Sequence, residues 1–130
     1  MRRGVLDAGV VLGWIRGQHR SLNRLAALFA ASRAGRVKLD ISCVNLAEVL
    51  IHGRLYERGS GVDLVALLRG HRVEIHAPDE AIARRVAVLR TSLADGFAAA
   101  TALELGARLH TTDRELARQL KGARLSIIVY

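Results

Sequence analysis

Residues 5–12 read Val-Leu-Asp-Ala-Gly-Val-Val-Leu, so one carboxylate, Asp7, interrupts an otherwise apolar run. We interpret this run as a core strand over residues 3–7 that passes directly into a buried helix over residues 8–15. A lone carboxylate at such a junction is costly unless a partner or a metal ion compensates its charge. The alternative is a carboxylate that accepts hydrogen bonds from the amides of the following helix. We favour the metal ligand.

Three further acidic residues, Glu48, Asp95 and Asp113, also stand where a short apolar run stops and a helical pattern begins. The chain has only 12 carboxylates against 20 Lys and Arg, so this one kind of position holds a large share of them. In an open parallel sheet, ligands bind just beyond the carboxyl ends of the strands. Carboxylates gathered there form a divalent-metal site.

Short β-like runs alternate with longer stretches of helical period along the whole chain. This alternation predicts an α/β fold with a parallel sheet. The predicted strands cover residues 3–7, 37–42, 72–76, 107–111 and 125–129. The predicted helices cover residues 8–15, 21–34, 62–69, 79–90, 93–105 and 113–121, with one more that starts at Asn45.

Length, charge and cysteine content narrow the class of protein. A chain of 130 residues is long enough for one domain with a real core. The net charge of +8 favours a polyanionic partner, nucleic acid ahead of an anionic membrane surface. The single cysteine, Cys43, fits a reducing cytosol. Because no apolar run approaches the length of a membrane span and no cleavage region follows the N-terminus, we expect a cytoplasmic protein.

Helix capping offers a separate structural explanation for three of the acids. Residues 45–48 (Asn-x-x-Glu) come close to a capping box, and residues 112–115 (Thr-x-x-Glu) have its full form, which would put Asp113 in the first turn. Residues 92–95 (Ser-x-x-Asp) can be interpreted in the same way. The capping explanation has to be applied separately to each acid. A single metal site explains the positions of all four acids, so we favour the metal site.

The order of these motifs resembles a PIN domain, and more narrowly the VapC toxins of bacterial type II toxin–antitoxin pairs. The similarity extends over the whole chain, and the order and spacing of the motifs together are specific. The motifs are Leu6-Asp7, then Ser42-x-x-Asn45-Leu46-Ala47-Glu48-Val49, then Leu93-Ala94-Asp95-Gly96-Phe97-Ala98-Ala99-Ala100-Thr101-Ala102, then Leu109-His110-Thr111-Thr112-Asp113.

This resemblance implies one PIN domain over residues 1–130, folded as a three-layer α/β/α sandwich around a mostly parallel five-stranded sheet. It also implies a Mg²⁺- or Mn²⁺-dependent endoribonuclease. The acidic quartet of the family maps onto Asp7, Glu48, Asp95 and Asp113. Asp7, Asp95 and Asp113 are then the metal ligands, and Glu48 is a ligand or the base that orients water. Thr111 matches a hydroxyl position that often helps to hold the last aspartate.

The chain departs from the family pattern after the first aspartate. A Ser, Thr or Asn commonly follows within two residues, whereas Ala8 and Gly9 stand here. The departure removes a supporting hydrogen bond and bears on metal affinity, not on the fold.

Basic residues are the candidates for guiding an RNA backbone to the acids. They are Arg16, Arg20, Arg114 and Arg118, and for each of them a solvated helix face is the alternative. The resemblance further implies a VapB-like antitoxin, whose tail covers the acidic groove, and a homodimer.

Two other functions stay open from the sequence. One is a PIN-like module that binds RNA or protein without cleaving it, which the missing hydroxyl after Asp7 permits. The other is a receiver-like phosphoacceptor. That class needs paired acids at the first strand and a lysine after the last, and the chain has neither.

Overall fold

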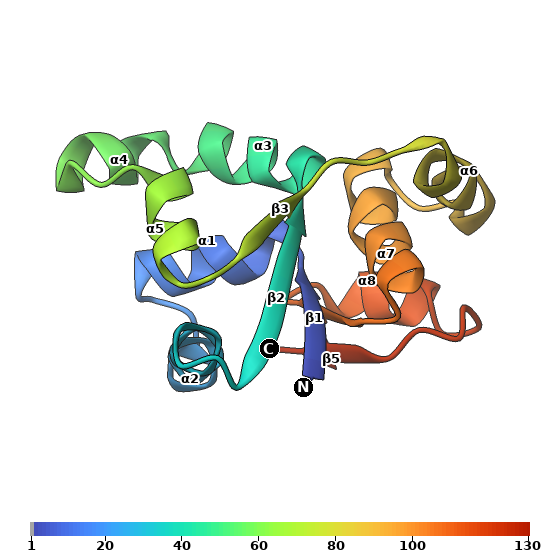
Figure 1. Cartoon of the computed structure of the whole chain (residues 1–130), viewed down its shortest axis with the longest axis horizontal. Coiled ribbons are helices and arrows are strands. Elements are labelled where there is room, and N and C mark those ends of the chain that lie inside the picture. The colour runs from blue at the N-terminus through green and yellow to red at the C-terminus, as the bar shows by residue number, and fades with distance from the viewer. Residues whose placement is uncertain (1) are drawn as a thin grey trace.

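The computed structural model describes residues 2–130, which form a five-stranded sheet flanked by helices (Figure 1). The strand order is β3-β2-β1-β4-β5, and every neighbouring pair is parallel. The carboxyl ends of all five strands therefore lie at one edge. The strands are β1 (Arg2–Leu6), β2 (Val37–Ser42), β3 (Glu74–His76), β4 (Arg108–Thr111) and β5 (Ile127–Val129). The predicted sheet is confirmed, and it is wholly parallel.

Eight helices occur in the described part of the chain. They are α1 (Ala8–Arg16), α2 (Leu22–Arg33), α3 (Cys43–His52), α4 (Arg54–Ser60), α5 (Leu64–Gly70), α6 (Glu80–Leu89), α7 (Leu93–Leu105) and α8 (Arg114–Gln119). Helix α4 was not predicted, because none of its residues is buried and it has no apolar face to give a periodic signal. Helix α3 begins two residues before the predicted Asn45, because the Ser42 hydroxyl accepts a hydrogen bond from the Val44 amide at 3.2 Å.

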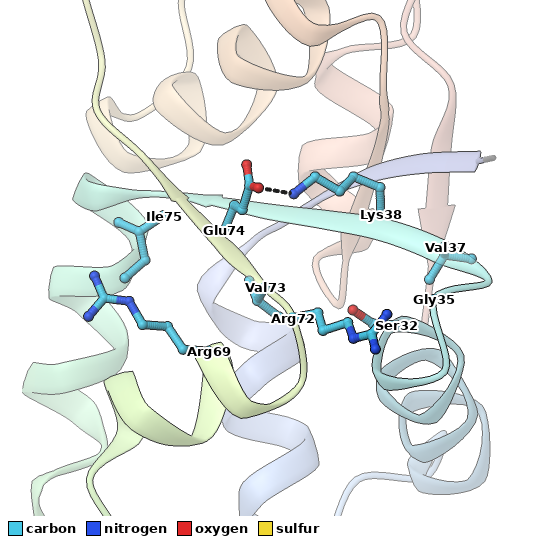
Figure 2. Close-up of a pocket in the computed structure, with 9 residues that line it drawn as sticks. All are labelled: Ser32, Gly35, Val37, Lys38, Arg69, Arg72, Val73, Glu74 and Ile75. Atoms are coloured by element: carbon cyan, nitrogen blue, oxygen red, sulfur yellow. Dashed lines mark ion pairs between the residues drawn. The ribbon is translucent and has the colours of Figure 1, made fainter.

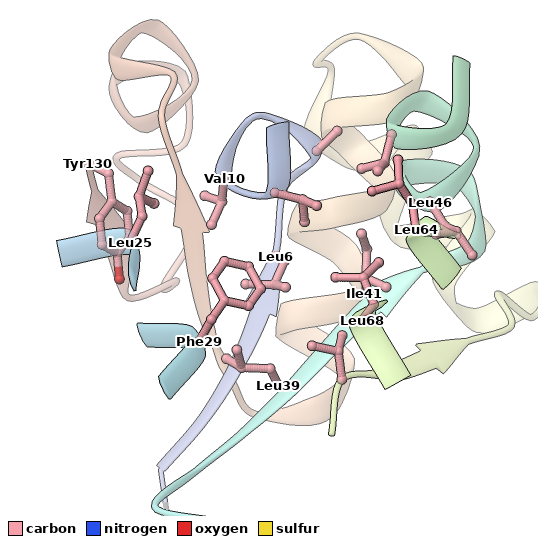
Figure 3. Close-up of a cluster of buried hydrophobic side chains, with 14 residues drawn as sticks. Leu6, Val10, Leu25, Phe29, Leu39, Ile41, Leu46, Leu64, Leu68 and Tyr130 are labelled. Carbon is pink, nitrogen blue, oxygen red and sulfur yellow. The ribbon is translucent and has the colours of Figure 1, made fainter. Parts of the chain in front are cut away.

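Two hydrophobic cores lie on the opposite faces of the sheet. On one face, Leu6 of β1 packs with Leu39 of β2 and with Phe29 of α2 (Figure 3). On the other face, Val5 packs with Leu109 of β4 and with the alanines of α7, which are Ala98, Ala99 and Ala102. Adjacent strand residues point to opposite faces, so Leu6 and Val5 serve the two cores. The predicted three-layer sandwich is confirmed.

Helix α1 ends at Arg16, because Gly17 adopts a left-handed backbone with φ of 69°. Arg16 and Arg20 therefore do not share one continuous helix. None of the helices in residues 2–130 is by itself long and apolar enough to cross a membrane, although α6 and α7, which meet at an angle of 118°, together reach the required length and composition.

Candidate functional site

Asp7 links β1 to α1 and is almost fully buried, with 6% of its surface exposed. It caps α1, since one carboxylate oxygen accepts the Ala8 amide at 2.9 Å. The other oxygen accepts the Thr111 hydroxyl at 2.8 Å. The Asp7 carboxylate thus accepts a hydrogen bond from an amide of the following helix, which is the alternative to metal binding that the sequence left open.

These two hydrogen bonds do not fully offset the cost of burying the charge. The pKa of Asp7 is raised to about 6 as the net result of opposing effects. Burial is the largest cause and the negative charges of Asp95 and Glu48 add to it, whereas the hydrogen bonds from Thr111 and Ala8 lower the pKa. Asp7 therefore remains energetically unfavourable as an anion, and two other acids of the predicted quartet are near enough to contribute.

The Thr111 hydroxyl is shared between two of the predicted acids. While donating to Asp7, it accepts the backbone amide of Asp113 at 3.0 Å. Next to it, the Asp7 amide donates to the His110 carbonyl at 2.9 Å. The ends of β1 and β4 are thereby tied together at the carboxyl edge of the sheet.

Asp113 caps α8 directly, because its Oδ1 accepts the amides of Glu115 at 2.9 Å and Leu116 at 3.1 Å. The capping box predicted for residues 112–115 was therefore wrong by one residue. The Thr111 hydroxyl holds the Asp113 amide while Asp113 still has extended φ and ψ angles of −96° and 102°, so the helix begins only at Arg114.

Asn45 links Glu48 to the first turn of α7, where Asp95 lies, and sequence reasoning missed this role. Its side-chain amide is fully buried and donates to Glu48 Oε1 at 3.1 Å and to the Ala94 carbonyl, next to Asp95, at 3.0 Å. The capping box predicted for residues 45–48 was wrong, because Ser42 caps α3 and the Asn45 contact joins two side chains. A buried amide on an apolar helix face was the available signal.

Asp95 lies in the first turn of α7, where its amide donates to the Ser92 hydroxyl at 3.4 Å, as the motif in residues 92–95 predicts. It does not follow a strand, since α6 precedes α7. Helix α7 nevertheless packs against β1 and β4, and its first turn lies close enough to Asp7 for Asp95 to affect the pKa of that carboxyl group.

In residues 2–130, no three His, Cys, Asp or Glu side chains lie close enough together to hold a metal ion. The expected convergence of all four acids on one point is thus not preformed, since helix amides and Asn45 hold several of the acids separately. The donor chemistry still suits a hard divalent cation, because every candidate ligand is an oxygen. Two buried groups are also left incompletely stabilised. The cost of burying the Asp7 charge is only partly offset by its hydrogen bonds. Asn45 Oδ1 has no hydrogen-bond partner among the described residues.

Gly9 lies directly beneath the side chain of Thr112. A Cβ atom added at Gly9 would overlap the Thr112 hydroxyl oxygen. The space that a Ser or Thr side chain at residue 9 would need is therefore filled from across the β4–α8 turn. Because Gly9 has no side chain, Thr112 can pack against the backbone of α1 at this position.

The four predicted RNA-binding arginines are distributed over two regions. Arg114 directly follows Asp113 at the start of α8, and Arg118 pairs with Glu115 at 2.9 Å on the same helix. Arg16 lies at the far end of α1, about 12 Å along the helix axis from its first residue, and donates to the His52 carbonyl at 3.0 Å. Arg20 lies beyond that helix end.

Comparison with known proteins gives one family. Residues 4–121 match the PIN domain family. The fold is similar to VapBC2 from Rickettsia felis bound to a DNA fragment from their promoter, with a TM-score of 0.71, 19% identity and 98% of each chain covered. It is also similar to a toxin–antitoxin complex from Klebsiella pneumoniae, with a TM-score of 0.69, 18% identity and coverage of 97% and 96%. FitAcB from Neisseria gonorrhoeae gives a TM-score of 0.66, 23% identity and 96% coverage of each chain. No curated protein sequence matches.

Proposed function

The chain belongs to the PIN-domain family, and from this premise we propose that it is a divalent-metal-dependent endoribonuclease, the toxin of a type II toxin–antitoxin pair. One observation carries the proposal: the buried carboxylate of Asp7, at the carboxyl edge of a parallel sheet, has its pKa raised to about 6 by burial and by Asp95 and Glu48. Perturbed carboxylates at such an edge are typical of catalytic sites.

Asp7, Asp95 and Asp113 are the residues that would hold Mg²⁺ or Mn²⁺. Such an ion, when bound, lowers the pKa of a water molecule and polarises the scissile phosphate. Asp7 supplies an oxygen whose position is set by the Thr111 hydroxyl and the Ala8 amide. Asp113 reaches the same edge at the start of α8.

Glu48 is the proposed group that orients the attacking water and accepts its proton. Asn45 fixes it by donating to Oε1 at 3.1 Å, which leaves the second carboxylate oxygen for the water. Arg114 and Arg118 are proposed to contact RNA phosphates beside the acids, with Arg16 and Arg20 farther along the strand. Such contacts position the backbone and carry no sequence information.

The proposed partners are a VapB-like antitoxin and a second copy of the chain. The toxin–antitoxin complexes from Rickettsia felis and Klebsiella pneumoniae, which share the fold, support an antitoxin partner. With RNA as the proposed substrate, the cytoplasm is the proposed location.

The test of the nuclease proposal compares RNA cleavage by the wild type, Asp7→Asn and Asp95→Asn, with Mg²⁺, with Mn²⁺ and with EDTA. The matched control is Asp63→Asn, because Asp63 also caps a helix, α5, and accepts amides at 2.9 Å and 3.1 Å. We expect roughly a hundredfold loss or more in the two site variants and none in the control. Cleavage that survives EDTA would contradict the proposal.

One observation favours a second candidate, a PIN-like module that binds RNA or protein without cleaving it. Within the described residues, no three acids are gathered closely enough to enclose a cation. This candidate predicts RNA binding that is insensitive to EDTA, with no cleavage under any metal condition.

A further inference from the structure

Basic residues stand at the amino end of every strand. Because the strands are parallel, these residues share the edge opposite the acids. They are Arg2 and Arg3 in β1, Lys38 in β2, Arg72 just before β3, Arg108 in β4 and Arg124 ahead of β5. No local sequence motif marks this edge, because the residues come from five separate segments.

Acidic partners neutralise only part of this edge. Arg3 pairs with the buried Asp40 at 3.1 Å. Lys38 pairs with Glu74 at 2.7 Å, in a cleft of about 610 Å³ that also contains Arg72 (Figure 2). For the remaining four guanidinium groups, no hydrogen bond or ion pair occurs within residues 2–130. These are Arg2, Arg72, Arg108 and Arg124.

Three of these four unpaired groups line one cleft of about 570 Å³, here termed the arginine cleft. Its walls come from the starts of β1 and β4, the segment before β5 and the end of α7. The arginines that line it are Arg2, Arg3, Arg108 and Arg124. With Arg3 paired to Asp40, the cleft retains three positive charges that have no protein partner among the described residues.

Arg124 occupies a backbone conformation that disfavours it. Its φ is 49°, in the left-handed region that glycine adopts readily and arginine does not. Arg72, in the neighbouring cleft, has a φ of 62°. Strained residues of this kind gather at functional sites. The arginine side chain at residue 124 therefore comes with a backbone strain that the turn itself does not explain.

The negative end of a neighbouring helix does not balance the positive charges of the arginine cleft. The C-terminus of α7 borders it at Gly106, and the carbonyl groups there attract cations. The end of a helix carries about half a negative charge. That is too little to balance three guanidinium groups, so the cleft keeps a positive potential that favours a polyanion.

We propose that the arginine cleft binds the phosphodiester backbone of single-stranded RNA, as a contact surface separate from the acidic edge. The choice of RNA rests on the proposed function, whereas the preference for a polyanion rests on the unpaired charges of the cleft alone. A strand of five residues spans about 17 Å. An RNA that engages both edges must therefore extend over several nucleotides around the sheet.

The experiment measures binding of a labelled single-stranded RNA in EDTA over a range of salt concentrations. The cleft variant is Arg108→Gln with Arg124→Gly, in which the glycine suits the left-handed backbone. The matched control, Arg54→Gln with Arg58→Gln, removes the same charge from the exposed helix α4. Two lost contacts should flatten the slope of log affinity against log salt by about 1.4 and weaken binding about 25-fold at 0.1 M salt. The control should leave the slope unchanged.

Equal losses in the two variants would overturn the proposal, because they would show a general charge effect. An unchanged slope in the cleft variant would also overturn it, provided that melting curves show both variants folded. Tighter binding of single-stranded DNA, or loss of binding to phosphatidylserine vesicles only, would reject RNA as the occupant. Since EDTA prevents metal-dependent cleavage, failure of the nuclease proposal would not affect this readout.

Discussion

The Thr111 hydroxyl donates to Asp7 at 2.8 Å, although the two residues are 104 positions apart in the chain. The same oxygen accepts the Asp113 amide at 3.0 Å. One small side chain at the end of β4 thus holds the first proposed metal ligand and the backbone of the last. The site depends on this pairing, because Asp7 is buried and its other oxygen has only the Ala8 amide.

Replacing Thr111 with valine tests this pairing. Val keeps the shape but removes both the hydrogen bond donated to Asp7 and the acceptor of the Asp113 amide. We therefore expect a loss of about 1–3 kcal/mol in the free energy of unfolding at pH 8. The pKa of Asp7 should also rise, because the Thr111 hydrogen bond lowers it. Urea titrations and the pH profile of cleavage measure the two effects. Thr111→Ser is the control and should behave as the wild type does.

Asp7→Asn should stabilise the metal-free protein at neutral and higher pH. The pKa of Asp7 is raised from 3.8 to about 6, so its stabilising contribution is fully present below pH 3.8 and is lost as the pH rises through 6. The shift corresponds to about 3 kcal/mol. Asparagine retains the helix cap without titrating. Unfolding titrations in EDTA from pH 4 to 8 should therefore show a variant advantage that grows with pH. A large destabilisation at pH 8 would instead make Asp7 a structural cap.

The overlap between Gly9 and Thr112 predicts a reversal of sign in a double variant. Gly9→Ala alone should destabilise by about 1–3 kcal/mol, because the new Cβ atom meets the Thr112 hydroxyl. In a Thr112→Ala background the same change should stabilise by up to about 1 kcal/mol, since alanine is the better helix former. Thermal melts of the four proteins complete the cycle. If the effects of the two substitutions were additive, the turn between β4 and α8, which carries Thr112, would move freely away from α1.

His110 should lower the stability of the protein as the pH falls, whereas Asp7 lowers it as the pH rises. Burial lowers the pKa of His110 to about 4, with a smaller effect from Arg108, and its Nδ1 lies 2.8 Å from the Tyr130 hydroxyl. Its stabilising contribution is present above pH 6.5 and is lost as the pH falls through 4. In the Asp7→Asn background, His110→Gln should reduce the loss of stability between pH 6.5 and 4. The control is the exposed His52→Gln, which should leave it unchanged.

The fold was largely predictable because its signals are local. Five predicted strands lie within two residues of those observed, and residues 93–105 form a helix with the predicted ends. The errors have physical causes. Arg72 and Arg124, with positive φ, delay β3 and β5, and the two capping boxes shifted because Ser42 and Asp113 cap the helices instead.

The sequence by itself determined the alternation of strands and helices and the placement of Asp7 at a strand–helix junction, because hydrophobic period and turn chemistry act over a few residues. Only the tertiary structure decided which side chains meet. Thr111 reaches Asp7, Asn45 reaches Ala94, and Thr112 fills the space over Gly9. Strand register and helix packing set these contacts, and they also gather the basic residues of five segments at one edge. No local pattern encodes such distances, because they arise only when segments far apart in the chain pack together.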